Sequence, residues 1–244
     1  MFQPASLKGS SPTPIDERIR KKFYPLYVFI ILLSFLPLSI FEYSYFILLW
    51  QENYYWIFFI LLPANFFFGI YLLQISSLIV SGLFLLLVNI FHMPKEGTYK
   101  RNIEDPEYFY WNVRNIIKKW ALDIVASNPF PWLKNRFSLR FFGIHIGKHC
   151  VCDNSFISSE FVSIGDNVIL GMGTCIFSFG IEAEDFILKE IKISDDVLIG
   201  AKCTILPGTH IKEGATMAAH SYTQYEGLLE EDKVYKGHPA KEAD

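Results

Sequence analysis

The chain has 244 residues, of which 51% are hydrophobic and 17% aromatic, and a formal net charge of −3. This charge excludes the strongly basic surface that nucleic-acid binding requires, and no nucleic-acid partner is expected. The four cysteines, at 150, 152, 175 and 203, form no C-x-x-C pair, so neither a disulfide scaffold nor a metal site is predicted.

Residues 24–93 have the composition of membrane-spanning helices, because their only charged residues are Glu42 and Glu52. The first uncharged run, 24–41, has 18 residues, about enough to cross a hydrocarbon layer of ~30 Å with its aromatic flanks. The second, 54–93, has 40 residues and is too long for one upright helix. Pro63 offers a place for a kink or a restart, so two or three crossings remain open on length alone.

Basic residues flank both ends of this segment: Arg18, Arg20, Lys21 and Lys22 before it, and Lys95, Lys100 and Arg101 after it. The positive-inside rule places both ends in the cytoplasm, which requires an even number of crossings. We therefore predict a cytoplasmic tail (1–23) and a transmembrane hairpin (24–93). A cleaved signal peptide is the alternative, but no A-x-A-like site follows the first run. The rest of the chain is expected on the cytoplasmic side.

Residues 94–143 mix aromatic and basic side chains, among them Trp111, Trp120 and Trp132. Such a mixture suits amphipathic helices that lie on an anionic membrane surface. The alternative is ordinary packing of connector helices against the next domain. We predict interfacial connector helices over 94–143, with membrane lipid as a partner.

An aliphatic or small residue recurs at every sixth position in two blocks. The first block is Ile146, Cys152, Ser158, Ile164, Leu170 and Ile176, and the second is Ile193, Ile199, Ile205, Ile211 and Met217. Cys152 and Ser158 are the two weak members. A period of six fits neither a helix nor a flat strand, but it is the repeat of a parallel β-helix with three strands in each coil. We predict a left-handed parallel β-helix over 144–225.

The two blocks are separated by 17 residues instead of six, which predicts an inserted loop at 177–191. Loops inserted into repeat proteins commonly lie on the functional face. The loop contains Phe179 and an acidic group formed by Glu182, Glu184 and Asp185. These carboxylates are expected to bind a cationic amine acceptor, to orient a histidine, or to lie in solvent.

The interrupted repeat, together with the closing segment "KVYKGHPAKEAD" within 226–244, resembles hexapeptide-repeat acyltransferases. The apolar hairpin, "EGTY" (96–99) and "FFGIHIGKHC" are similar to the membrane-bound carboxy-terminal modules of some nonribosomal peptide synthetases. The resemblance covers 24–241. It implies a membrane-anchored homotrimer that moves an acyl group from CoA or a carrier thioester to a hydroxyl or amine, with no tightly bound cofactor.

The resemblance also implies a catalytic histidine at the start of the inserted loop, where this chain has Phe179. Register counting places the corner after Ile205 one coil from Phe179, and His210 at its edge. His210 is therefore the first candidate for the general base and His220, at another corner, the second. The expected contacts to the acyl donor are Gly200, Ala201, Ala218, Lys236 and Lys241.

Two functions of different classes follow. The first is a membrane-anchored acyltransferase that modifies a lipid, a saccharide or a small amine. The second is a catalytically inactive membrane scaffold that keeps the β-helix for trimerisation and partner binding. It is suggested by Phe179, which stands where the resemblance implies a catalytic histidine. A carbonic anhydrase on the same fold would need three histidines around one metal, and the spacing offers no such triad.

Overall fold

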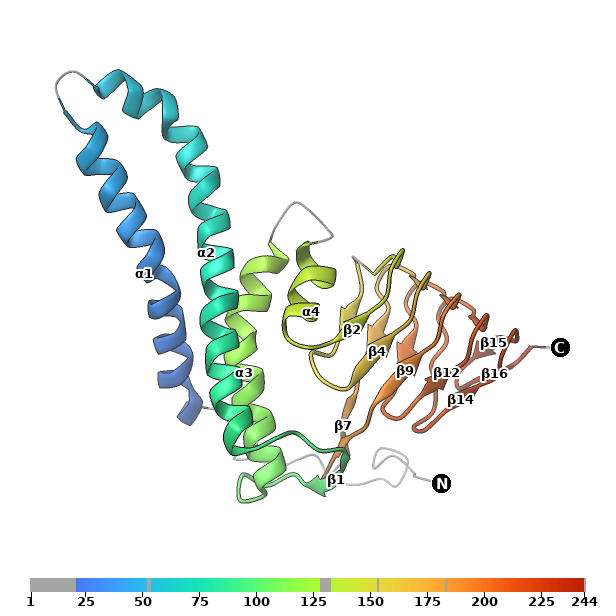
Figure 1. Cartoon of the computed structure of the whole chain (residues 1–244). Helices are drawn as coiled ribbons and strands as arrows, with labels where there is room; N and C mark the ends of the chain where they lie inside the picture. The colour runs from blue at the N-terminus through green and yellow to red at the C-terminus, as the bar shows by residue number, and fades with distance from the viewer. Residues whose placement is uncertain (1–20, 52–53, 128–132, 153, 183, 244) are drawn as a thin grey trace. The chain divides into compact units, whose positions relative to one another are not determined.

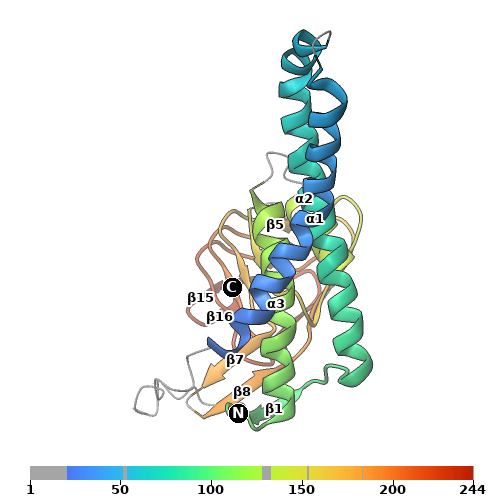
Figure 2. The same cartoon turned by 90° about the vertical axis from the view of Figure 1, so that its left-hand side faces the viewer.

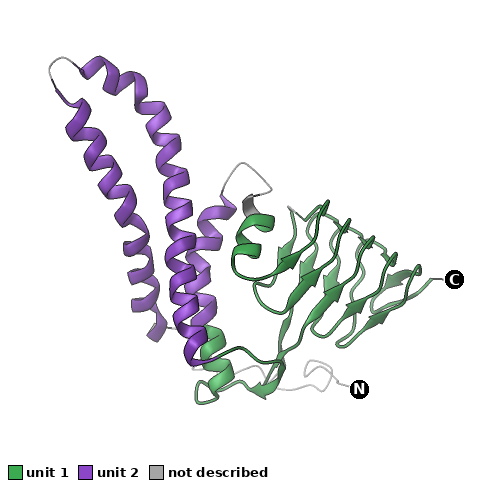
Figure 3. Cartoon of the chain, in the orientation of Figure 1, with its two compact units in different colours: residues 1–19, 93–112, 128–244 green, residues 20–92, 113–127 purple. Residues whose placement is uncertain are grey.

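The structure is a computed structural model that describes residues 21–51, 54–127, 133–152, 154–182 and 184–243. The predicted tail therefore lies outside the described residues except for a short 3-10 turn, η3 (Lys21–Phe23). The chain divides into two compact units (Figure 3), one holding 93–112 and 128–244, the other 20–92 and 113–127. Helix α3 (Pro106–Ala126) contributes its first turns to one unit and the rest to the other.

Two long apolar helices form most of the second unit: α1 (Tyr24–Leu49) and α2 (Tyr55–Phe91). α2 runs through Pro63 without a break, so the segment contains two helices and not three. The helices run side by side in Figures 1 and 2, and the hydroxyl of Ser76 donates to the carbonyl oxygen of Ser34 across them at 2.8 Å. By length and composition both could cross a bilayer.

A polar pair joins these two helices inside their apolar surroundings. The side-chain amide of Asn65 donates to both carboxylate oxygens of Glu42, at 3.1 and 2.9 Å. Gly69 leaves room beside this contact, because a Cβ there would lie 3.3 Å from Glu42 Oε1. Interhelical polar contacts of this kind stabilise helix pairs in lipid.

Asn65→Leu is expected to destabilise the helix pair by about 1–2 kcal/mol, because the Glu42 carboxylate loses its donor in apolar surroundings. The double variant Glu42→Leu/Asn65→Leu should recover most of the loss, since neither polar group is then left alone. Thermal unfolding of the full chain in nanodiscs measures both. Ser44→Ala, whose hydroxyl bonds only within α1, is the control, and a double variant less stable than Asn65→Leu would contradict the contact.

The first unit contains a parallel β-helix whose short strands build three faces (Figure 1). The first face has β2 (His145–Ile146), β4 (Val162–Ile164), β9 (Ile191–Ile193), β12 (His210–Ile211) and β14 (Leu228–Leu229). The second has β5 (Ile169–Leu170), β10 (Leu198–Ile199), β13 (Thr216–Met217), β15 (Val234–Gly237) and the antiparallel β16 (Ala240–Glu242). The third has β3 (Phe156–Ile157), β6 (Cys175–Ile176) and β11 (Thr204–Ile205). The six-residue period thus reflects a chain that visits the three faces in turn.

The inward positions of the coils carry the predicted residues, with one shift of register. Ile164, Ile176, Ile205 and Ile211 are all buried. On the third face, however, Ile157 pairs with Ile176, so Ser158 does not occupy the predicted strand position. The spacing is five residues before Ile157 and seven after it, which leaves the register of every later coil unchanged.

The β-helix also continues beyond its predicted end at residue 225. β14 pairs with β12, and β15 pairs with β13, both in parallel. Thr223, Leu229 and Tyr235 keep the six-residue spacing and all three are buried. Much of the predicted closing segment is therefore a further coil.

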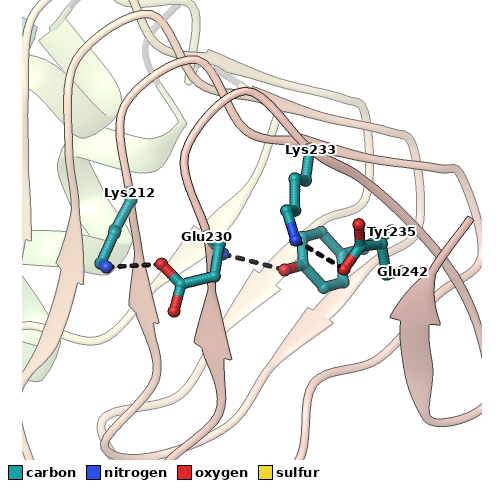
Figure 4. A network of polar contacts seen from close by, with 5 residues as sticks. All are labelled: Lys212, Glu230, Lys233, Tyr235 and Glu242. Atoms are coloured by element: carbon teal, nitrogen blue, oxygen red, sulfur yellow. Dashed lines mark hydrogen bonds and ion pairs between the residues drawn. The ribbon is translucent and has the colours of Figure 1, made fainter.

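Polar contacts hold this last coil (Figure 4). Lys212 forms an ion pair with Glu230, whose backbone N–H donates to the Tyr235 hydroxyl at 2.9 Å. Lys233 pairs with Glu242 at 2.8 Å, which ties β16 to the preceding corner. These side chains are largely exposed, so each pair contributes little to stability, but together they order the end of the chain.

The inserted segment is a β-hairpin and not an irregular loop. β7 (Phe179–Glu182) pairs antiparallel with β8 (Asp185–Leu188), and β8 pairs with β1 (Gly97–Lys100) on its other side. Figure 2 shows this small sheet beside the β-helix. A strand that precedes the β-helix by more than forty residues thus completes the inserted sheet.

Aromatic side chains from the first turns of α3 pack on this hairpin. Trp111 lies with its ring centroid 4.6 Å from that of Phe186, and Tyr108 lies 5.2 Å from the same ring. The predicted interfacial segment therefore begins with a strand, and two of its aromatics are buried at 3% and 4% exposure. Further on, η4 (Leu133–Phe137) and α4 (Ser138–Phe141) present Phe137 and Phe141 outward, while Trp132 lies outside the described residues.

Candidate functional site

The hairpin leaves and rejoins the β-helix at the corner between the third and the first face, and a groove of about 330 Å³ lies there. Its lining residues are Glu96, Gly97, Lys189, Glu190, Gly208, His210 and Glu226. Glu96 and Gly97 lie at the start of β1, and Lys189 and Glu190 lie between β8 and β9. Gly208 and His210 come from the end of a corner and the start of β12, and Glu226 from the corner of the following coil. The groove thus forms where the regular repeat is interrupted.

His210 is the first residue of β12, and its side chain points outward. Its strand neighbours are Lys192 on β9 and Leu228 on β14. The backbone is fixed from both sides, since His210 N donates to Gly227 O at 2.8 Å and Ile211 is buried in the core. Ile205 pairs with Ile176 on the adjacent coil, which is the register behind the predicted position of His210, and this register brings His210 to the groove.

The carboxylates around His210 are held by different partners. Glu226 forms an ion pair with Lys189, and Glu190 pairs with Lys192 at 3.0 Å. The hydrogen bond and charge of Glu190 raise the pKa of Lys192, so its ammonium stays charged. Glu96 instead accepts a hydrogen bond from the backbone N–H of Glu190 at 3.0 Å. The groove therefore combines an exposed imidazole with carboxylates, which are the groups used in proton transfer.

Phe179, the residue in the place where relatives are expected to carry histidine, is packed among aromatic rings. Its ring centroid lies 4.9 Å from that of Trp111 and 5.9 Å from that of Phe177. It belongs to the aromatic cluster of Tyr108, Trp111 and Phe186 and does not line the groove.

The three predicted acidic residues lie along the hairpin and not in the groove lining. The Tyr225 hydroxyl donates to Glu182 at 2.8 Å. Burial raises the pKa of Tyr225, and Glu182 raises it further, so this hydroxyl stays protonated and remains a donor. Asp185 lies 3.5 Å from Lys100, and Glu184 accepts through its backbone carbonyl from Arg101 N at 2.8 Å. Glu182 and Asp185 thus hold the hairpin against its neighbours.

The expected donor-binding residues gather at another corner, between the second and the third face. Gly200 N donates to Met217 O, and His220 N donates to Ala201 O, at 2.8 and 2.9 Å. The coils approach so closely here that a Cβ on Gly200 would lie 2.4 Å from Ala219 N. Ala218 continues this stack on the next coil, where its N–H donates to Tyr235 O. His220, which has φ +59°, is exposed at this corner, so the two candidate histidines lie at different corners of the β-helix.

The two lysines of the closing segment face each other across the β15–β16 pair. Lys236 lies opposite Lys241, and both are exposed. Like charges directly opposite each other are unfavourable in a sheet, but they form a favourable position for an anion. Gly237 N donates to the Ser221 hydroxyl at 3.0 Å, which joins this turn to the corner of His220.

The other groove residues do not stand out in the sequence. Lys189 and Glu190 lie within the predicted loop but carried no assigned role, and Glu226 lies where the repeat was expected to have ended. Glu96 was noted only as part of a motif. Counting one more hexapeptide repeat beyond Met217 would have placed Glu226 at the corner beside Gly208.

Comparisons with known proteins agree with this architecture. A family model described as "Hexapeptide repeat of succinyl-transferase" matches residues 161–185 and 190–222, on either side of the hairpin's return. Residues 161–185 and 190–222 therefore match hexapeptide-repeat sequence. "Putative acetyltransferase YvoF" of Bacillus subtilis (strain 168) is 31% identical over 111 residues, which are 44% of this chain and 63% of YvoF. The chain thus contains hexapeptide repeats in the matched segments and is similar over part of its length to an acetyltransferase of that description.

Two solved structures are similar to part of the chain. The hexapeptide-repeat acetyltransferase VCA0836 from Vibrio cholerae is 27% identical, covering 41% of this chain and 61% of that chain with a TM-score of 0.37. A maltose O-acetyltransferase from Clostridium difficile 630 is 20% identical, covering 52% and 82%, with a TM-score of 0.40. The chain thus spans less than two thirds of YvoF and of the Vibrio protein.

Proposed function

We propose that the protein is a membrane-anchored acyltransferase. It moves an acyl group from CoA or a carrier thioester to a hydroxyl or amine of a lipid, a saccharide or a small amine. The observation that carries this proposal is the groove beside His210, which lies where a hairpin interrupts a hexapeptide β-helix. An exposed imidazole in a concave site with carboxylates suits general-base chemistry.

In this mechanism His210 takes a proton from the acceptor hydroxyl or amine. The freed oxygen or nitrogen attacks the carbonyl carbon of the thioester, the C–S bond breaks, and the thiolate takes up a proton as it leaves. A backbone N–H near the groove stabilises the negative oxygen of the tetrahedral intermediate. His220 is the second candidate for the base.

The acyl donor is proposed to lie along the corner formed by Gly200, Ala201 and Ala218, with Lys236 and Lys241 at the phosphates of CoA. Because this corner and His210 lie apart within one copy, the donor bound to one copy is proposed to reach His210 of a neighbouring copy in the trimer. The close approach of the coils at Gly200 offers backbone groups without side chains, and the opposed lysines offer positive charge. No tightly bound cofactor is needed.

The assembly is proposed to be a homotrimer of left-handed β-helices on the cytoplasmic side of a membrane crossed by α1 and α2. An outward and mostly apolar row runs along the second face. Val151, Ile169, Leu198 and Val234 are exposed in it, and Thr216 lies between Leu198 and Val234. Such a row marks a surface that a partner covers, and a second copy of the chain would cover it in a trimer.

Lys236→Glu/Lys241→Glu is expected to weaken CoA binding at least about tenfold, because two attractive charges become repulsive. Calorimetry on the full chain in detergent measures the dissociation constant. Lys148→Glu, an exposed lysine on the first coil, is the matched control. Equal CoA binding by the double variant and the wild type would remove these lysines from the donor site.

The release of thiol from acetyl-CoA or an acyl-carrier protein in the presence of alcohol and amine acceptors tests the function itself. A catalytically inactive scaffold is the second candidate, and it is favoured by the packing of Phe179 in the aromatic cluster. The scaffold predicts no thiol release with any donor and no measurable CoA binding. Thiol release with any donor, or measurable CoA binding, would favour the transferase over the scaffold.

A further inference from the structure

The motif Glu96–Tyr99, "EGTY", lies at the groove. It precedes the β-helix by nearly fifty residues, yet Glu96 and Gly97 both line the same depression as His210. The general-base mechanism at His210 assigns no role to this motif.

The motif is built to hold Glu96 in place. The Tyr99 hydroxyl turns back onto the chain and lies 3.0 Å from the carbonyl oxygens of both Lys95 and Glu96. Gly97 leaves space for this ring, because a Cβ there would lie 2.8 Å from Tyr99 Cζ and would displace it. Pairing of β1 with β8 then fixes the motif to the hairpin, with Gly97 opposite Leu188.

Glu96 also contacts the point at which the hairpin rejoins the β-helix. Its Oε2 accepts a hydrogen bond from the backbone N–H of Glu190 at 3.0 Å. A carboxylate held by a backbone donor and a clamped turn loses little side-chain entropy when it binds a ligand. Glu96 is therefore a preorganised carboxylate on the wall of the groove.

The charges of the groove favour a cation. Glu226 pairs with Lys189, and Glu190 pairs with Lys192. The Glu96 carboxylate accepts from a neutral backbone N–H, and its charge also acts on Lys192. Among these described residues, the carboxylates of Glu96, Glu190 and Glu226 thus face the ammonium groups of Lys189 and Lys192, which leaves one carboxylate in excess. A concave site with an excess carboxylate concentrates cations and repels anions.

From this geometry we infer that Glu96 determines acceptor specificity, by binding the ammonium of an amine acceptor beside His210. This inference rests on the proposed transferase function and narrows its acceptor to amines. The bound ammonium gives one proton to the His210 imidazole, and the neutral nitrogen attacks the thioester carbon. The C–S bond breaks, the new amide N–C bond forms, and the second amine proton goes to the leaving thiolate.

The test compares two small acceptors that differ by one group, ethanolamine and ethylene glycol, with acetyl-CoA as donor and the full chain in nanodiscs. Glu96→Gln, which keeps the size and removes the charge, is expected to raise the KM for ethanolamine about tenfold with kcat little changed. The KM for ethylene glycol should not change. Glu96→Asp should recover part of the ethanolamine affinity, and Glu213→Gln, an exposed glutamate on another corner, should behave as wild type.

A binding experiment separates this inference from the proposed function. The ring signal of His210, assigned by its loss in His210→Asn, is followed by NMR while ethanolamine is added. A shift in the wild type that is lost in Glu96→Gln supports amine binding even if no donor is ever turned over. Equal effects of Glu96→Gln on both acceptors, or no shift in the wild type, would overturn it.

Discussion

His210→Ala is expected to lower acyl transfer about 100-fold, the usual contribution of a general base, without disturbing the fold. The side chain points out of β12, and its neighbours keep the strand in place. Ile211 is buried, and the buried Thr209 hydroxyl bonds to Thr223 at 2.9 Å and to Leu206 O at 2.7 Å. Removal of the imidazole therefore leaves the core and the coil contacts intact. Thiol release at saturating donor and acceptor measures the effect.

Two further histidine variants make the experiment specific. His145→Ala removes an exposed histidine from the same face, on β2 in the first coil, and should leave turnover unchanged. His220→Ala tests the second candidate. A large loss in His220→Ala with normal turnover in His210→Ala would transfer the role of base to the other corner, and normal turnover in both would exclude a histidine base at either position.

The β-helix could be predicted from the sequence because most of its inward positions carry aliphatic residues six apart. The predicted end of the β-helix is wrong because Thr223, the next residue in the six-residue register, is polar and does not resemble a core residue. In the structure its hydroxyl is buried against Thr209, so the coil continues on a satisfied polar pair. The prediction of Ser158 as an inward residue is also wrong, because Ile157 takes that position. The spacing is five residues before Ile157 and seven after it, so the later coils keep the six-residue register and the sequence gives no sign of the shift.

The groove was only partly predictable. Counting coils brings His210 next to the interruption, since stacked coils convert sequence spacing directly into position. Glu96 could not be found in this way, because the pairing of β1 with β8 joins segments about ninety residues apart. Such pairing depends on tertiary packing and follows no period. The packing of Phe179 could not be predicted for the same reason, because its aromatic partner Trp111 belongs to α3, far away in the sequence.

The aromatic cluster leads to the largest expected effect on stability. Phe186 has 0% exposure, and its ring contacts Trp111 and Tyr108. Phe186→Ala is therefore expected to cost about 3–5 kcal/mol, from lost burial and the cavity that remains. Because β8 joins β7 to β1, the whole inserted sheet should open more readily, and hydrogen exchange of the β7 and β8 amides measures this opening.

The matched control lies directly across the hairpin. Ile181 pairs with Phe186 in register but is 41% exposed, so Ile181→Ala should cost less than about 1 kcal/mol. If the cluster holds the wall of the groove, Phe186→Ala should also lower acyl transfer, because Lys189 and Glu190 directly follow β8. Faster exchange in the hairpin with unchanged exchange in β10 and β13 would place the damage in the inserted sheet. Equal exchange in the two variants would show that the aromatic cluster does not stabilise the hairpin.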